Sequence, residues 1–169
     1  MLVALVLLPV AARVPLERNL VASVYDPQRI QYGTLLTEDA MRLIQRSRGT
    51  LPDDAVVLGA PSRGATYWWS LGGVHVVYPT RAGADEDTPE DALASVWPTL
   101  GQEGSEVCTL LNRLGVRYFY SSSDVTASGS ETGSAPLRWD SALTQVPAAG
   151  LELVDSEGSA SLWRITACG

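Results

Sequence analysis

The chain has 169 residues, of which 46% are hydrophobic and 18% are charged, so it is long enough for one domain with a buried core and too apolar for a disordered chain. Its net charge is −7 at pH 7, and its 12 basic residues are all arginines scattered along the sequence, a distribution that offers no footprint for nucleic acid. The composition and charge therefore indicate an acidic globular domain and exclude a nucleic-acid partner.

The N-terminal segment, residues 1–12, contains no charged side chain, and Arg13 follows it. Such a segment is too short to cross a bilayer as a helix, which takes about 20 residues, and it lacks the positively charged start of a secretory signal. A buried core element would show the same pattern, and a signal-like segment is a further alternative because Val10-Ala11-Ala12 could serve as a cleavage region. We favour the end of a transmembrane helix whose beginning precedes this chain. Residues 13–34, with Pro15 and Pro27, are then a linker. Residues 35–169 form an α/β domain outside the cytoplasm.

Helical and strand-like segments alternate from residue 35 onward. Thr37 is the expected N-cap of a first helix that has acids in its first turn and arginines toward its end. Thr88, followed by Pro89, marks the start of a later helix in the same way. The expected helices cover residues 35–48, 66–71, 88–100, 106–114 and 139–146, the expected strands cover residues 55–59, 74–78, 116–120, 151–154 and 160–166, and a Ser- and Gly-rich loop covers residues 121–135.

The order of these segments predicts the fold class. Strands separated by helices require crossover connections, which favour a mainly parallel sheet. The last two strands are joined by a short turn that contains Gly158, so they form an antiparallel hairpin. We therefore expect a small Rossmann-like α/β sandwich with a mainly parallel sheet and a C-terminal antiparallel hairpin.

The segment G-A-P-S-R-G, residues 59–64, lies between an expected strand and an expected helix. It is not a dinucleotide fingerprint, because Pro61 stands where a second glycine is needed, and it lacks the Lys-Ser/Thr pair of a P-loop. It is a near miss to the serine nucleophile elbow G-x-S-x-G, but His75, the only histidine, lies in the next strand rather than late in the fold. We favour a structural corner at the carboxyl end of a strand, where Ser62 and Arg63 are candidates for contacting a glycan or a phosphate. A small serine hydrolase that uses Ser62 is the alternative.

Aromatic and acidic clusters near this turn offer further binding hypotheses. Tyr67 and Trp68 are candidate ligand contacts, since these rings could stack on a sugar, although aromatic residues beside glycine-rich turns also serve as core residues or membrane-interface anchors. The acids of residues 85–91 lack the spacing of a calcium loop, which favours a solvated loop and helix start. We assign no metal site, no cofactor and no catalytic residue.

Cys108 and Cys168 are the only cysteines, and neither belongs to a C-x-x-C pair. With one histidine in the chain, they cannot complete the four ligands of a structural zinc site. A single disulfide and two buried free thiols both remain open, and the compartment decides between them.

Four segments together resemble a known family: L-P-D-D-A-V-V-L-G-A-P-S-R-G-A (51–65), L-G-G-V-H-V-V-Y-P-T (71–80), V-C-T-L-L-N-R-L-G-V-R-Y-F-Y (107–120) and L-E-L-V-D-S-E-G-S-A-S-L-W-R-I-T-A-C (151–168). They resemble the C-terminal extracytoplasmic domain of an actinobacterial family of multi-pass membrane proteins. That family has no known function and is similar to membrane glycosyltransferases that use polyprenyl-phosphate sugars. The resemblance covers about residues 20–168.

The resemblance carries several expectations. It implies that residues 1–12 end the last transmembrane helix, that Cys108 and Cys168 form an extracytoplasmic disulfide, and that the catalytic acid of such an enzyme lies in a membrane loop absent from this chain. We therefore expect a non-catalytic domain at the outer side of the cell membrane. It would take part in cell-envelope glycan assembly and hold a glycan, a lipid-linked sugar or a partner.

Overall fold

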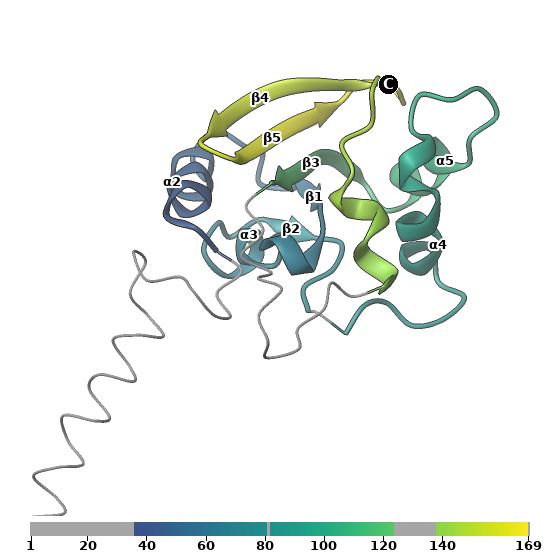
Figure 1. Cartoon of the computed structure of the whole chain (residues 1–169), viewed down its shortest axis with the longest axis horizontal. Helices are drawn as coiled ribbons and strands as arrows, with labels where there is room; N and C mark the ends of the chain where they lie inside the picture. The colour runs from purple at the N-terminus through teal and green to yellow at the C-terminus, as the bar shows by residue number, and fades with distance from the viewer. Residues whose placement is uncertain (1–35, 81, 124–137, 169) are drawn as a thin grey trace, which may run out of the picture.

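The structure, a computed structural model, describes residues 36–80, 82–123 and 138–168 (Figure 1). The expected membrane segment over residues 1–12 and the linker over residues 13–34 lie outside the described residues, as does most of the expected loop over residues 121–135. In the part of the chain that is described, none of the helices has the length and hydropathy needed to cross a membrane.

A five-stranded sheet forms the centre of the domain, in the order β2-β1-β3-β5-β4. Its strands are β1 (Val56–Leu58), β2 (His75–Val76), β3 (Val116–Ser122), β4 (Leu151–Glu157) and β5 (Ala160–Ile165). Strand β1 runs parallel to both β2 and β3, whereas β5 runs antiparallel to both β3 and β4. The α/β class and the C-terminal antiparallel hairpin are thus confirmed.

The sheet is mixed rather than mainly parallel. The hairpin forms one edge of the sheet, where β5 pairs with β3 and β4 is the outermost strand, so half of the strand pairings are antiparallel. The parallel part is also short, because β2 is a two-residue strand. Each antiparallel pairing is longer than either parallel pairing, which makes the hairpin the larger contributor of ladder hydrogen bonds.

Helices cover both faces of the sheet. The α-helices are α2 (Glu38–Ser47), α3 (Tyr67–Ser70), α4 (Pro89–Val96) and α5 (Val107–Arg113), and the 3₁₀ turns are η1 (Pro61–Arg63), η2 (Trp97–Thr99), η3 (Arg138–Asp140) and η4 (Ala142–Thr144). The predicted caps are confirmed, since Thr37 Oγ1 accepts from Ala40 N at 3.1 Å and Thr88 Oγ1 accepts from Asp91 N at 3.2 Å.

The predicted helix over residues 139–146 is wrong. Two 3₁₀ turns, η3 and η4, occupy this segment, and Gln145 is already extended. Local side-chain bonding accounts for the difference, because Thr144 Oγ1 donates to the Ser141 carbonyl at 2.7 Å and stabilises a tight turn.

Two hydrophobic cores lie on opposite faces of the sheet. Successive residues of a strand point to opposite faces, and accordingly Phe119 belongs to one core and Tyr120 to the other. The first core joins the sheet to α4, α5 and η4, and the second joins it to α2 and α3. In Figure 1, α2 lies at one side of the sheet and α4 and α5 lie at the other.

The elements that follow β1 and β3 lie on opposite faces of the sheet. Helix α3, which follows β1, lies on the α2 side, whereas η4, which follows β3, lies on the side of α4 and α5. Because β1 and β3 are adjacent parallel strands, these two exits diverge between the carboxyl ends of β1 and β3. Ligands of open α/β sheets bind at such a position.

Two links fasten the outer elements. Cys108 of α5 forms a disulfide with Cys168, with a Cα to Cα distance of 5.1 Å, which fits the expected bridge. On the other side of the sheet, Arg46 of α2 donates to Asp155 at 2.8 Å and to Glu157 at 2.9 Å on β4. These hydrogen bonds from Arg46 lower the pKa of both carboxyl groups.

Candidate functional site

The turn that follows β1 is a tight corner. Its backbone passes so close to β3 that a Cβ on Gly59 would lie 2.8 Å from the Tyr120 carbonyl oxygen. Pro61 begins the 3₁₀ turn η1, and Gly64 ends it in the left-handed conformation at a φ of 89°. Glycine is therefore required at position 59 for space and at position 64 for backbone conformation.

Ser62 and Asp140 meet at this corner, although 78 positions separate them in the sequence. The Ser62 amide donates to Asp140 Oδ2 at 2.8 Å, and the two residues are 3% and 0% exposed. Asp140 Oδ1 and Ser62 Oγ are both buried and have no hydrogen-bond partner among the described residues. A buried carboxylate with an unused acceptor is costly, which makes this corner the most unusual polar site of the fold.

Arg63 adds a positive charge at the same corner. Its side chain is half-buried, and Nη1 is buried without a hydrogen-bond partner in residues 36–80, 82–123 and 138–168. We call Ser62, Arg63 and Asp140 the Ser62 corner. One side-chain atom of each residue, Ser62 Oγ, Arg63 Nη1 and Asp140 Oδ1, is buried without a hydrogen-bond partner among the described residues.

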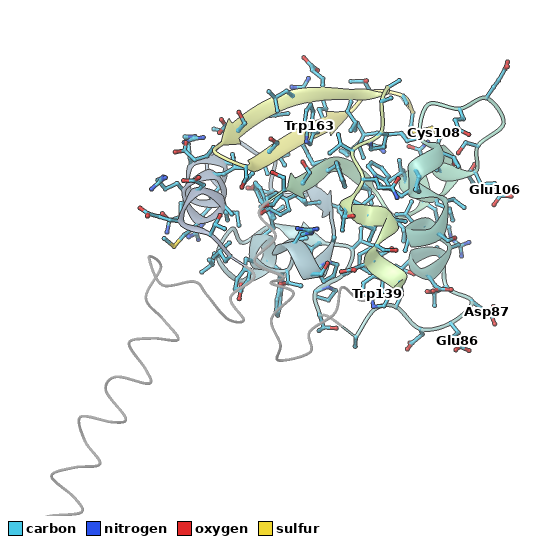
Figure 2. All side chains as sticks on the ribbon, viewed as in Figure 1. Glu86, Asp87, Glu106, Cys108, Trp139 and Trp163 are labelled. Atoms are coloured by element: carbon cyan, nitrogen blue, oxygen red, sulfur yellow. A yellow bond between two sulfur atoms is a disulfide. The ribbon has the colours of Figure 1, made fainter. Side chains whose placement is uncertain are left out.

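Trp139 holds Asp140 in place. Its ring packs against Tyr78 with a centroid distance of 5.0 Å, and it closes over Gly83, where a Cβ would lie 3.1 Å from Trp139 Cε2. Figure 2 shows Trp139 at the end of the molecule away from the β4–β5 hairpin. The aromatic contact fixes η3 and thereby the neighbouring carboxylate.

Tyr78 is the other half of this anchor. Burial, together with the nearby Glu90 and Asp91 carboxylates, raises the pKa of Tyr78. The hydroxyl therefore stays protonated and donates to the Glu90 carbonyl oxygen. This bond ties the strand end of β2 to the first turn of α4 and stabilises the wall behind Trp139.

The two aromatic residues predicted to contact a ligand, Tyr67 and Trp68, differ in their exposure to solvent. Trp68 is 0% exposed and packs edge to face on Tyr120, with ring centroids 5.8 Å apart, so its ring lies in the core between the sheet and α2. Tyr67 is half-buried against the same core. The exposed ring of α3 belongs to Trp69, which is 59% exposed. The structure therefore places Tyr67 near solvent and Trp68 away from it.

The structure offers no base to Ser62. His75 is exposed on β2, and no hydrogen bond joins Ser62 Oγ to it or to any other residue that the structure describes. The only carboxylate at the corner accepts from the Ser62 amide and not from its hydroxyl. A nucleophilic serine needs a base within hydrogen-bond reach.

Asp140 is the site residue that the sequence did not indicate. It lies in a segment predicted to be a plain helix, next to a loop of low complexity, and its partner is far away in the chain. No spacing rule links the two positions.

Metal binding has no support in the described residues, where no group of three or more His, Cys, Asp and Glu side chains is arranged to hold an ion.

Comparison with known proteins gives one match. No curated protein and no solved structure matches the chain significantly. A family model described as DUF6541, a family of unknown function, matches residues 1–167.

Proposed function

The chain belongs to the DUF6541 family, whose function is unknown, and we propose that it is a non-catalytic extracytoplasmic domain of a membrane protein that takes part in cell-envelope glycan assembly. In this proposal the domain is a Rossmann-like module that binds a glycan or a lipid-linked sugar at the Ser62 corner. The observation that carries the proposal is the set of buried polar groups without partners at the carboxyl end of β1.

The chemistry of the corner favours a hydroxylated ligand over a phosphate. A phosphate at such a turn would accept from the backbone amides, but the Ser62 amide already donates to Asp140. The carboxylate would also repel an anion. A sugar hydroxyl both donates and accepts, so it can donate to Asp140 Oδ1 while a neighbouring hydroxyl accepts from Arg63.

The disulfide supports the extracytoplasmic part of the proposal. Stable disulfides persist in oxidising compartments and are rare in the cytosol. Cys108 and Cys168 tie α5 to the end of the chain, as a structural bridge would. In this proposal residues 1–12 anchor the domain to the membrane.

A binding experiment with matched variants tests the glycan site. The full chain, with its disulfide intact, is titrated with soluble neutral oligosaccharides and followed by amide NMR. We expect shifts at residues 59–64 and at least tenfold weaker binding for Arg63→Gln and Asp140→Asn. Arg113→Gln, an exposed arginine at the end of α5, is the control. Equal affinity of all variants would refute the site.

Two further measurements separate the proposal from its alternatives. A serine hydrolase would label at Ser62 with a fluorophosphonate probe and lose activity in Ser62→Ala, whereas a non-catalytic domain would do neither. For the compartment, intact cells are treated with a membrane-impermeant thiol reagent after mild reduction. Protection of both cysteines in intact cells, with reaction only after lysis, would contradict the extracytoplasmic location.

A further inference from the structure

A polar pocket lies at the amino ends of β1 and β2, at the other end of β1 from the Ser62 corner. It has a volume of about 340 Å³ and is lined by Arg48, Leu51, Pro52, Asp53, Gly72, Gly73 and Val74. These residues belong to the C-terminal end of α2, the turn that enters β1 and the turn that enters β2. The volume falls at the lower end of the range of small-ligand sites, roughly 300–1,000 Å³.

Arg48 supplies an unused cation to this pocket. The other two arginines of α2, Arg42 and Arg46, donate to acidic side chains of α2 or β4. In contrast, the Arg48 guanidinium forms neither a hydrogen bond nor an ion pair with the residues that the structure describes. Its charge is therefore available to a ligand.

Asp53 supplies the opposite charge. It is exposed, and within the described ranges its carboxylate, like the Arg48 guanidinium, has no side-chain or backbone partner. The two residues line one pocket and yet no ion pair of 4.0 Å or less joins them. A ligand that contacts both must carry an acceptor group for Arg48 and a donor group for Asp53.

Backbone forms the part of the pocket wall that Gly72 and Gly73 line. A Cβ on Gly72 would lie 2.5 Å from the Trp68 carbonyl oxygen, so no larger residue fits there. Gly73 has a φ of 66°, and a Cβ there would lie 3.9 Å from Arg48 Nε. The guanidinium thus lies beside Gly73, where the wall of the pocket carries no side chain.

The geometry points to a small zwitterionic ligand in this pocket. We infer a compound with an anionic oxygen group that accepts from Arg48 and an ammonium group that donates to Asp53, as in an α-amino acid or a phosphoethanolamine group. A simple anion is disfavoured because Asp53 would repel it, and a simple cation is disfavoured by Arg48. The site is independent of the Ser62 corner, since the two share no residue.

Amide NMR of the full chain tests this inference and distinguishes an α-amino acid from a phosphoethanolamine headgroup as the ligand. Alanine and O-phosphoethanolamine are the two zwitterionic probes, with acetate, inorganic phosphate, ethanolamine and glucose as single-function controls. We expect one zwitterion or both to shift Gly72, Gly73 and the Arg48 side chain, with at least tenfold weaker binding of every control. Which of the two binds more tightly identifies the source as an amino acid or a headgroup.

Matched variants complete the test. Arg48→Gln and Asp53→Asn should each weaken zwitterion binding at least tenfold, whereas Arg113→Gln and Asp54→Asn, exposed residues that do not line the pocket, should leave it unchanged. The inference is overturned if neither zwitterion shifts these residues, or if acetate, phosphate, ethanolamine or glucose binds as tightly as the zwitterions. Shifts at residues 59–64 report on the Ser62 corner separately, so either site can fail while the other stands.

Discussion

The disulfide gives the sharpest quantitative prediction. Replacing both cysteines in Cys108→Ser/Cys168→Ser leaves the folded packing nearly intact, because both side chains are only half-buried. The bridge acts instead on the unfolded chain, whose freedom it restricts. With a sequence separation of 60 residues, the loop-entropy relation gives about 4 kcal/mol of stabilisation at 25 °C.

This free energy converts into a large change in melting temperature. For a domain of this size each kcal/mol corresponds to roughly 2–4 °C, so the double variant should melt roughly 10–15 °C below the oxidised protein. The assay is thermal unfolding by circular dichroism, with chemical denaturation as a second measurement. The wild-type protein in a reducing agent is the matched control, and it should melt close to the double variant.

Two results would refute this reasoning. A double variant that melts within about 2 °C of the oxidised protein would mean that the bridge does not restrict the unfolded state. A double variant that melts far below the reduced wild-type protein would mean that the serines disturb the folded state. In the second case the loop-entropy estimate would not apply.

Three other changes have clear expected outcomes. Asp140→Ala should cost about 1–3 kcal/mol in urea unfolding, because it leaves the buried amide of the turn after β1 without an acceptor, and Asp140→Asn should cost less. Gly72→Ala should cost about 1–3 kcal/mol, because its Cβ would lie 2.5 Å from the Trp68 carbonyl oxygen, and an unchanged unfolding midpoint would contradict that geometry. Hydrogen bonds from Arg46 lower the pKa of Asp155, so their contribution is complete above the ordinary Asp pKa of about 4 and is lost as the pH falls below it. The melting temperature should therefore fall less steeply between pH 6 and pH 3 for Arg46→Ala than for the wild-type protein. An equally steep fall in both proteins would show that the Arg46–Asp155 pair does not contribute to the pH dependence of stability.

Local signals in the sequence predicted most elements. Thr37 and Thr88 marked helix starts because a cap forms within one turn of the chain, and both hydroxyls accept the expected amides. The closing hairpin was predicted from the alternation along β5 and the turn at Gly158. The turn after β1 was predicted from local sequence as well, since Pro61 and Gly64 interrupt the strand-like pattern there.

Contacts between residues that are far apart in the chain explain which features the sequence did not predict. Nothing near residue 140 indicates that its carboxylate lies beside Ser62 rather than in solvent, because the contact spans 78 positions. The segment around it also looked helical, yet its side chains bond to nearby carbonyls and form turns. The pairing of β5 with β3 could not be predicted either, since the order of strands in a sheet depends on which edge strand is still unpaired when the C-terminal hairpin joins the sheet.

The sequence by itself determined an acidic α/β domain with two capped helices, a closing hairpin and a corner at residues 59–64, because caps, turns and alternation act over a few neighbouring residues. Only the tertiary structure decided which of the paired tryptophans is buried: Trp68 is 0% exposed and Trp69 is 59% exposed, since adjacent residues of a helix point in different directions and packing selects one. The tertiary structure likewise brought Asp140 to Ser62 and left Arg48 and Asp53 unpaired in one pocket. Such juxtapositions depend on the packing of whole elements, which no short stretch of the sequence encodes.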